Sequence, residues 1–195
     1  MVLRMCHWPE SRTLLPLGMA VNRKTLLATT LITTILVLDV VTKRWALESL
    51  AHGATVDAVG VPLTLAFNTG IAFGLDVPSA GRWILVGASV FVVFMLAGLF
   101  HQAKPSDFLR LSSVSLVTAG ALGNLIDRVR WDRGVVDFIG PIDLGLFHWP
   151  IFNVADMAIT TGAILLGVSL WREDAEPQTV AVFETENANR SGQEG

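Results

Sequence analysis

Residues 83–103 read WILVGASVFVVFMLAGLFHQA, an apolar stretch that contains no Asp, Glu, Lys or Arg. The hydrocarbon core of a bilayer is about 30 Å thick, and an α-helix needs about 20 mostly apolar residues to cross it. A helix also satisfies its backbone hydrogen bonds internally, as a segment must where water is absent. The stretch therefore predicts a membrane-spanning helix.

Three further stretches have the same character. Residues 25–42 contain one charged residue, Asp39, residues 111–126 contain none and end at Asp127, and residues 150–171 contain only Asp156. We expect the third stretch to extend far enough to include Asp127. The sequence thus predicts an all-α integral membrane protein with four transmembrane helices.

The composition of the 195-residue chain agrees with this fold class. Hydrophobic residues make up 52% and charged residues only 16%, whereas a soluble domain carries about 25% charge. The formal net charge is −3, so no basic excess favours nucleic acid. The single cysteine, Cys6, excludes an internal disulfide and a cysteine-based metal cluster. We expect no metal and no cofactor.

The segments outside the spans differ in character. We expect an N-terminal extension over residues 1–22, a membrane domain over 23–172 and an acidic, disordered tail over 173–195. The Val, Thr, Leu and Phe of residues 55–67 predict short strands, and Asn68-Thr69-Gly70 predicts a turn. The apolar residues 71–75 predict a short surface helix or flap. Lys and Arg divide almost evenly between the two sides of the membrane, so charge leaves the orientation open.

Three aspartates near or inside the spans carry the functional signal. Alternating the direction of the four helices places Asp39, Asp127 and Asp156 near the same membrane face. Ionisable residues in spans are costly and usually functional. Asn124 precedes Asp127 by three residues and Asn153 precedes Asp156 by three, which sets each amide on the same helix face as its aspartate.

Two carboxylates that meet in a low-dielectric site cannot both ionise easily. One then acts as an acid and the other as a base on water, which requires no metal. Helix dipoles predict that Asp156, near a helix N-terminus, is the more acidic, and that Asp127, near a C-terminus, keeps the proton.

Simpler interpretations stand beside this one. Asp39 could form an interfacial ion pair with Lys43, one turn further along the helix. Asp137 favours a structural role, such as an ion pair with a loop arginine. A proton- or ion-coupled transporter is the alternative function, although a relay should spread through the membrane depth. A membrane adaptor would leave the repeated Asn-x-x-Asp unexplained.

Five short stretches add a more specific signal. They are LDVVTK (38–43), FNTGIAF (67–73), GALGNLIDR (120–128), VVDF (135–138) and FNVAD (152–156). In this order, and in these positions relative to the spans, they resemble the lipoprotein signal peptidase (signal peptidase II) family. The resemblance covers residues 23–172. Residues 140–148 lengthen one loop relative to shorter members, which leaves the shape of that loop open.

The resemblance implies an activity and a location. It implies an inner-membrane aspartyl endopeptidase that removes signal peptides from diacylglyceryl-modified prolipoproteins, cutting N-terminal to the lipidated cysteine. It also implies cytoplasmic termini, an active site near the periplasmic face, a β-cradle with a flap for the substrate, and inhibition by globomycin. The expected partners are the prolipoprotein and membrane lipid, and we expect a monomer.

The resemblance also implies roles for individual residues. Asp127 and Asp156 become the catalytic dyad. The residues that orient the substrate or support the dyad are Asn68, Asn124, Arg128, Asn153 and Asp39.

Overall fold

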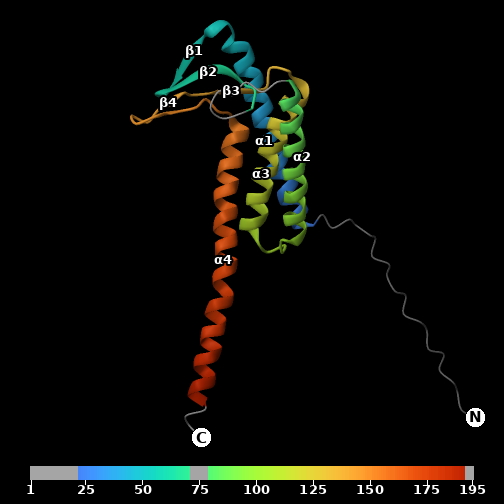
Figure 1. Ribbon diagram of the computed structural model, residues 1–195, viewed down its shortest axis with the longest axis vertical. Helices are drawn as coiled ribbons and strands as arrows, with labels where there is room; N and C mark the ends of the chain where they lie inside the picture. Colours follow the sequence, from blue (N-terminus) through green and yellow to red (C-terminus); the bar gives the residue numbers. More distant parts are fainter. Residues whose placement is uncertain (1–21, 71–78, 192–195) are drawn as a thin grey trace, which may run out of the picture.

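Four long helices dominate the computed structural model, which describes residues 22–70 and 79–191 (Figure 1). They are α1 (Arg23–Ser49), α2 (Ser79–Gln102), α3 (Phe108–Arg130) and α4 (Val154–Ser191). Each contains a segment long and apolar enough to cross a membrane, namely residues 23–49, 81–102, 108–130 and 154–172. The predicted four-helix membrane fold is therefore confirmed, and the third helix does include Asp127.

Helix α3 is the centre of the bundle and packs against each of the other three helices. Within its most apolar window 56% of the residues are buried, against 6% for α2. Small residues make this close packing possible. A Cβ atom on Gly123 would lie 2.7 Å from Asp39 Oδ2 and 3.2 Å from Ala155 Cβ. Segments of α1 and α4 consequently meet α3 near its C-terminal end.

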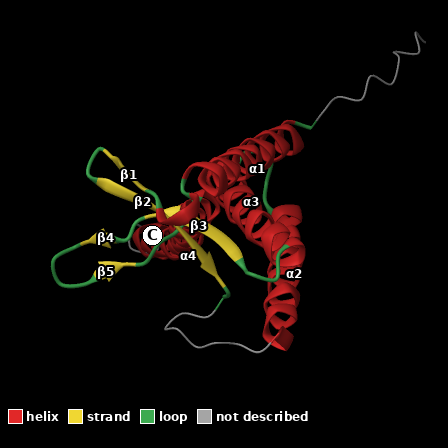
Figure 2. Cartoon of the chain, turned by 90° about the horizontal axis from the view of Figure 1, so that it is seen from above, coloured by secondary structure: helices red, strands yellow, loops and turns green. Residues whose placement is uncertain are grey.

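Two small antiparallel sheets cover one end of the bundle (Figure 2). The first has the order β1 (Thr55–Ala58), β2 (Val61–Asn68) and β3 (Val135–Ile139), and the second pairs β4 (Ile142–Asp143) with β5 (His148–Trp149). In the register of β2 and β3, Phe67 faces Val136 and Ala66 faces Asp137. This pairing confirms the strands predicted for residues 55–67 and ties the first loop to the chain that follows α3.

A small hydrophobic core joins the first sheet to the helices. Ala46 and Leu50, at the end of α1, pack with Phe138 of β3, and Val154 at the start of α4 contacts the same cluster. The strands therefore rest on the helix ends at fixed positions. As a result, the end of α3, the start of α4 and the middle of β3 converge.

The structure differs from the sequence expectations at both ends of α4. Residue 150 does not open this helix, because Phe152 and Ile139 exchange backbone hydrogen bonds of 2.9 and 3.0 Å and hold the chain extended. The helix begins at Val154, so Asp156 lies in its first turn and not two turns in. At the other end, the backbone is helical to Ser191, where a disordered tail is expected; Ala, Glu and Gln in this segment are good helix formers.

Two expectations fall largely or wholly outside the described residues. They are the surface helix or flap over residues 71–75 and the N-terminal extension over residues 1–22, of which only Asn22 is described.

Candidate functional site

The site is organised around the first turn of α4. The Oδ1 atom of Asn153 accepts the backbone N–H of Asp156 at 2.9 Å, and Asp156 Oδ2 accepts the backbone N–H of Asn153 at 3.2 Å. This reciprocal pair is a capping box, which satisfies N–H groups that a helix start leaves without partners. The Asn-x-x-Asp spacing of residues 153–156 thus fixes the position of the Asp156 carboxylate at the end of the helix.

Asn124 connects α3 to this turn. Its Nδ2 donates to Asp156 Oδ1 at 2.7 Å, and its Oδ1 accepts from Asn153 Nδ2 at 3.1 Å. Asn124 therefore bonds to the aspartate of the other helix and not to Asp127 of its own helix. The two Asn-x-x-Asp units belong to one hydrogen-bond network, but their asparagines have different structural roles.

A buried ion-pair cluster lies on the α1 side of this network. Lys43 Nζ lies 2.8 Å from Asp39 Oδ2 and 2.9 Å from Asp127 Oδ2, and it donates to Asn124 Oδ1 at 3.2 Å. The Asp39 side chain is 1% exposed, and its Oδ1 accepts the backbone N–H of Ala155 at 3.0 Å. Burying charges requires such pairing and hydrogen bonding. The cluster therefore locks α1, α3 and α4 together.

Asp127 is held in the same cluster. Besides Lys43, its Oδ2 accepts the backbone N–H of Val136 in β3 at 3.3 Å. The ion pair between Asp39 and Lys43 that the sequence raised as an alternative is present, and Lys43 pairs with Asp127 as well. Both carboxylates thus have a cation as a direct partner.

Asp137 of β3 shares one hydrogen-bond partner, Asn153, with Asp156. It is 2% exposed, and Asn153 Nδ2 donates to its Oδ1 at 2.6 Å. Burial, and then the charge of Asp156, raise the pKa of Asp137 to about 6, although hydrogen bonds from Asn68 and Asn153 lower it. Instead of the loop-arginine ion pair expected from sequence, two asparagines hold this side chain.

Arg128 completes the polar lining. Its Nη1 donates to the backbone oxygen of Asn124 at 3.4 Å, and its buried Nε has no hydrogen-bond partner. The guanidinium also interacts electrostatically with Asp156, Asp137 and Asp127. A buried donor without a partner is costly, so this edge of Arg128 is suited to a further acceptor.

All seven residues predicted from sequence therefore join one connected site. Asn68 reaches it from the end of β2 through Asp137, and its Oδ1 also accepts the backbone N–H of Gly70 at 2.9 Å. Two members, Lys43 and Asp137, were not among the predicted site residues. The signals for them were a lysine inside a span and an aspartate within the apolar strand VVDF.

Two apolar cavities meet at Asp156. One of about 340 Å³ runs between α2, α3 and α4 and is also lined by Asn124 and Arg128. The other, of about 410 Å³, lies between the β4–β5 hairpin and α4, with Leu144 and Trp149 in its wall. Within residues 22–70 and 79–191, no group of three or more His, Cys, Asp and Glu side chains is arranged to hold a metal ion. Carboxylates beside apolar cavities can act on a peptide that is partly embedded in lipid.

Comparisons with known proteins agree with this geometry. The family model described as signal peptidase (SPase) II matches residues 31–172. A lipoprotein signal peptidase of Syntrophotalea carbinolica is 43% identical over 113 residues, covering 57% of this chain and 68% of its own. One of Burkholderia thailandensis is 37% identical over 139 residues, covering 68% and 80%. A solved structure described as a bacterial membrane enzyme superposes with a TM-score of 0.67 at 28% identity, covering 76% of this chain and 90% of its own.

Proposed function

The chain belongs to the signal peptidase II family, and we propose that it is an aspartyl endopeptidase acting on diacylglyceryl-modified prolipoproteins. The family and the four spans indicate a multi-pass protein of the bacterial inner membrane that removes signal peptides from prolipoproteins. The observation that carries the finer proposal is the position of Asp156, which lines two apolar cavities and is linked to Asp127 through Asn124 and Lys43.

We propose Asp127 and Asp156 as the catalytic dyad, which is the assignment that the sequence motifs imply. Asp156 accepts hydrogen bonds from the side chain of Asn124 and the backbone N–H of Asn153 and lies in the first turn of α4. Asp127 is held near the end of α3 by Lys43 and by the backbone N–H of Val136. Two carboxylates that divide the roles of acid and base are the arrangement of an aspartic protease.

A pairing of Asp137 with Asp156 is the alternative. Asn153 Nδ2 donates to Asp137 Oδ1 at 2.6 Å, and burial raises the pKa of Asp137 to about 6. In the proposed assignment Asp137 and Asp39 are positioning residues, which act through Asn153 and Lys43.

The proposed reaction is hydrolysis by an activated water. Asp156 takes a proton from water, whose oxygen adds to the scissile carbonyl carbon, while Asp127 donates its proton to the carbonyl oxygen. When the C–N bond breaks, the proton on Asp156 passes to the leaving amine, and a hydroxyl of the tetrahedral intermediate returns a proton to Asp127 as the carbonyl re-forms. Arg128 offers its inward-facing Nε–H to a substrate oxygen. The cut leaves the lipidated cysteine as the new N-terminus.

The cavities suit a substrate with two apolar parts. A diacylglyceryl prolipoprotein carries acyl chains on one side of the scissile bond and an apolar signal peptide on the other. Two mostly apolar cavities that meet at Asp156 could hold both at once. This arrangement supports cleavage on the N-terminal side of the lipidated cysteine. The proposal also includes a site near the outer face, cytoplasmic termini and a working monomer, which the family resemblance implies.

A cleavage assay on the full chain tests the proposal. The purified protein is incubated with a diacylglyceryl-modified prolipoprotein, and Asp156→Asn and Asp127→Asn are expected to abolish cleavage while the fold is retained. Asp137→Asn should keep more turnover than Asp127→Asn. Asp143→Asn, in the exposed β4–β5 hairpin, is the matched control and should cleave normally.

Each result has a distinct reading. No cleavage by the unmutated protein contradicts the activity, and full activity of Asp156→Asn contradicts the dyad. If Asp137→Asn is inactive and Asp127→Asn is active, the alternative pairing of Asp137 with Asp156 is correct. Globomycin should inhibit the unmutated enzyme.

A further inference from the structure

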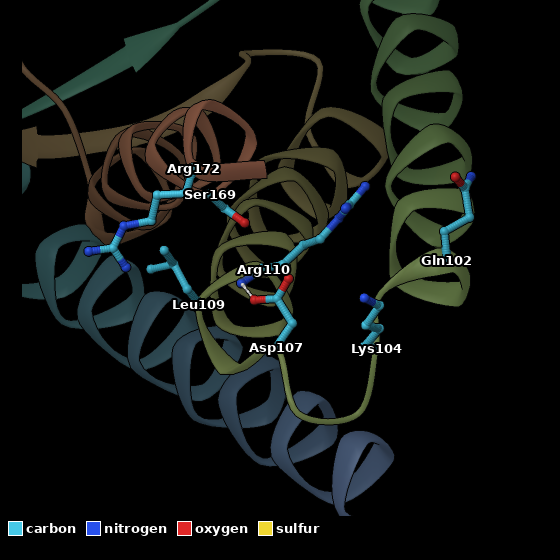
Figure 3. A pocket seen from close by; sticks show the side chains of 7 residues that line it. All are labelled: Gln102, Lys104, Asp107, Leu109, Arg110, Ser169 and Arg172. Atoms are coloured by element: carbon cyan, nitrogen blue, oxygen red, sulfur yellow. Dashed lines mark hydrogen bonds between the residues drawn. The ribbon is translucent and has the colours of Figure 1, made fainter. Parts of the chain in front are cut away.

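A polar cavity lies at the end of the bundle opposite Asp156. Its volume is about 260 Å³, and it is formed where α2, α3 and α4 meet beside the α2–α3 turn (Figure 3). The lining residues are Gln102, Lys104, Asp107, Leu109, Arg110, Ser169 and Arg172. None of them belongs to the site described above, and the proposed peptidase activity makes no use of them.

The charge of this cavity favours an anion. Three cationic side chains, Lys104, Arg110 and Arg172, line it with one acid, Asp107. Asp107 Oδ1 already accepts the backbone N–H of Arg110 at 3.0 Å, as the N-cap of α3. Figure 3 shows this bond, with the Arg110 side chain extending toward α2. The lining therefore carries two more positive charges than negative ones.

A neighbouring lysine removes a source of repulsion. Lys24 Nζ donates to the backbone oxygens of His101 at 3.2 Å and Ala103 at 2.9 Å, at the C-terminal end of α2. These carbonyls form the negative end of the α2 dipole, which would otherwise disfavour a bound anion. An anion at the cavity therefore meets a neutralised helix end.

The depth of the cavity matches the lipid phosphates. Gln102, Phe108 and Arg172 are terminal residues of three of the membrane spans. The cations of the cavity therefore lie at the ends of the apolar segments. Beside them Phe108 is 61% exposed and Trp171 is 74% exposed. Aromatic side chains are enriched at the headgroup level, and basic pockets between spans bind anionic headgroups. A phospholipid whose phosphate is bound there would thus place its acyl chains against exposed apolar helix faces.

We propose that this cavity binds the phosphate of an anionic phospholipid, in the leaflet opposite the peptidase site. Free phosphate shares the chemistry, but the lipid is favoured because the cavity opens at the ends of the apolar spans, where lipid phosphates are concentrated. The proposal depends on the membrane-spanning fold and does not depend on the proteolytic mechanism.

The test measures lipid binding by the full chain in detergent. Native mass spectrometry compares bound dioleoyl-phosphatidylglycerol with bound dioleoyl-phosphatidylcholine, and a third arm adds inorganic phosphate at millimolar concentration as a competitor. The variant Lys104→Gln/Arg172→Gln is compared with Arg23→Gln/Arg44→Gln, which removes the same charge from exposed positions outside the cavity. Lys104→Arg/Arg172→Lys keeps the charge and tests whether the fold tolerates change there.

The expected result is preferential phosphatidylglycerol binding that falls about fivefold for each cation removed from the cavity. The control pair and the charge-conserving pair should bind almost as the unmutated chain does. Equal binding of both lipids would overturn the proposal, as would an equal loss in the control pair. Displacement of the lipid by millimolar inorganic phosphate would show a free-phosphate site instead.

Discussion

The side-chain amide of Asn153 donates a 2.6 Å hydrogen bond to the carboxylate of Asp137. Through its oxygen and its backbone N–H, the same asparagine forms the capping box with Asp156. One residue thus starts α4 and sets the separation of two carboxylates from different elements. Because a helix start is rigid once it is capped, this arrangement preorganises Asp156 of the proposed dyad before substrate arrives.

Substitution of Asn153 should therefore affect stability and activity separately. Asn153→Ala removes the cap and the donor to Asp137, and we expect a loss of about 1 kcal/mol in unfolding free energy and a loss of cleavage of about 10- to 100-fold. Asn153→Ser keeps a capping oxygen but has no amide for Asp137, so it should recover stability and not activity. Thermal unfolding and initial rates measure the two effects. Full activity in Asn153→Ser would contradict the role given to the amide.

The buried Asp137 predicts a particular dependence of stability on pH. Its pKa rises from 3.8 to about 6 on folding, so between these values the folded protein binds more protons than the unfolded chain. Stability from this group is therefore fully present below pH 3.8 and is lost as pH rises through 6, by about 3 kcal/mol in total. Asp137→Asn cannot ionise and should lack this loss.

The measurement is the melting temperature of Asp137→Asn minus that of the unmutated protein, at several pH values from 4 to 7.5. We expect the difference to grow with pH, together with a partial loss of cleavage by the variant. Asp143→Asn, in the exposed hairpin, should show no such trend. A difference that stays constant across the range would mean that the pKa of Asp137 does not change on folding.

The spans and seven polar residues of the site could be predicted from sequence, but most of their partners could not. Length and apolar composition are enough to identify four helices, because the bilayer imposes one simple requirement. Asp39, Asn124 and Asp156 are conspicuous for the same reason, since polar residues in spans are few. The hydrogen bond between Asp137 and Asn153 depends on the register of β2 and β3, which places Asp137 opposite Ala66.

The start of α4 shows why the motif alone was ambiguous. Asn-x-x-Asp occurs at 124–127 and at 153–156. In the first turn of a helix the aspartate of the motif can reach back to a backbone N–H. This is the capping box of Asn153 and Asp156. Near the end of α3 the backbone N–H groups are already used within the helix, so Asn124 is free to bond across to α4. The same spacing therefore has two structural meanings.

Removal of Lys43 should lower the stability of the folded protein more than removal of an exposed cation. Lys43→Met leaves the carboxylates of Asp39 and Asp127 buried without their cation, and breaking a buried pair costs about 3–5 kcal/mol. The triple variant Lys43→Met/Asp39→Asn/Asp127→Asn removes all three charges and should recover most of this loss. Arg44→Met, exposed on the same helix, is the control. Equal melting temperatures of Lys43→Met and Arg44→Met would contradict a stabilising cluster.

The packing of α4 on α3 should depend on Gly162 and not on Gly167, although both lie in the same span. A Cβ at Gly162 would approach Ser113 O to 2.8 Å and Val117 Cγ2 to 2.7 Å, whereas one at Gly167 would meet nothing within 4 Å. Gly162→Ala must push the helices apart, at about 1–3 kcal/mol. Gly167→Ala should be neutral or stabilising by up to about 1 kcal/mol, because alanine favours the helix. Because α4 also carries Asp156 in its capping box, a shift of α4 should displace this carboxylate. Gly162→Ala should therefore also reduce cleavage. Unchanged melting temperature and activity in Gly162→Ala would show that α3 and α4 do not pack this closely.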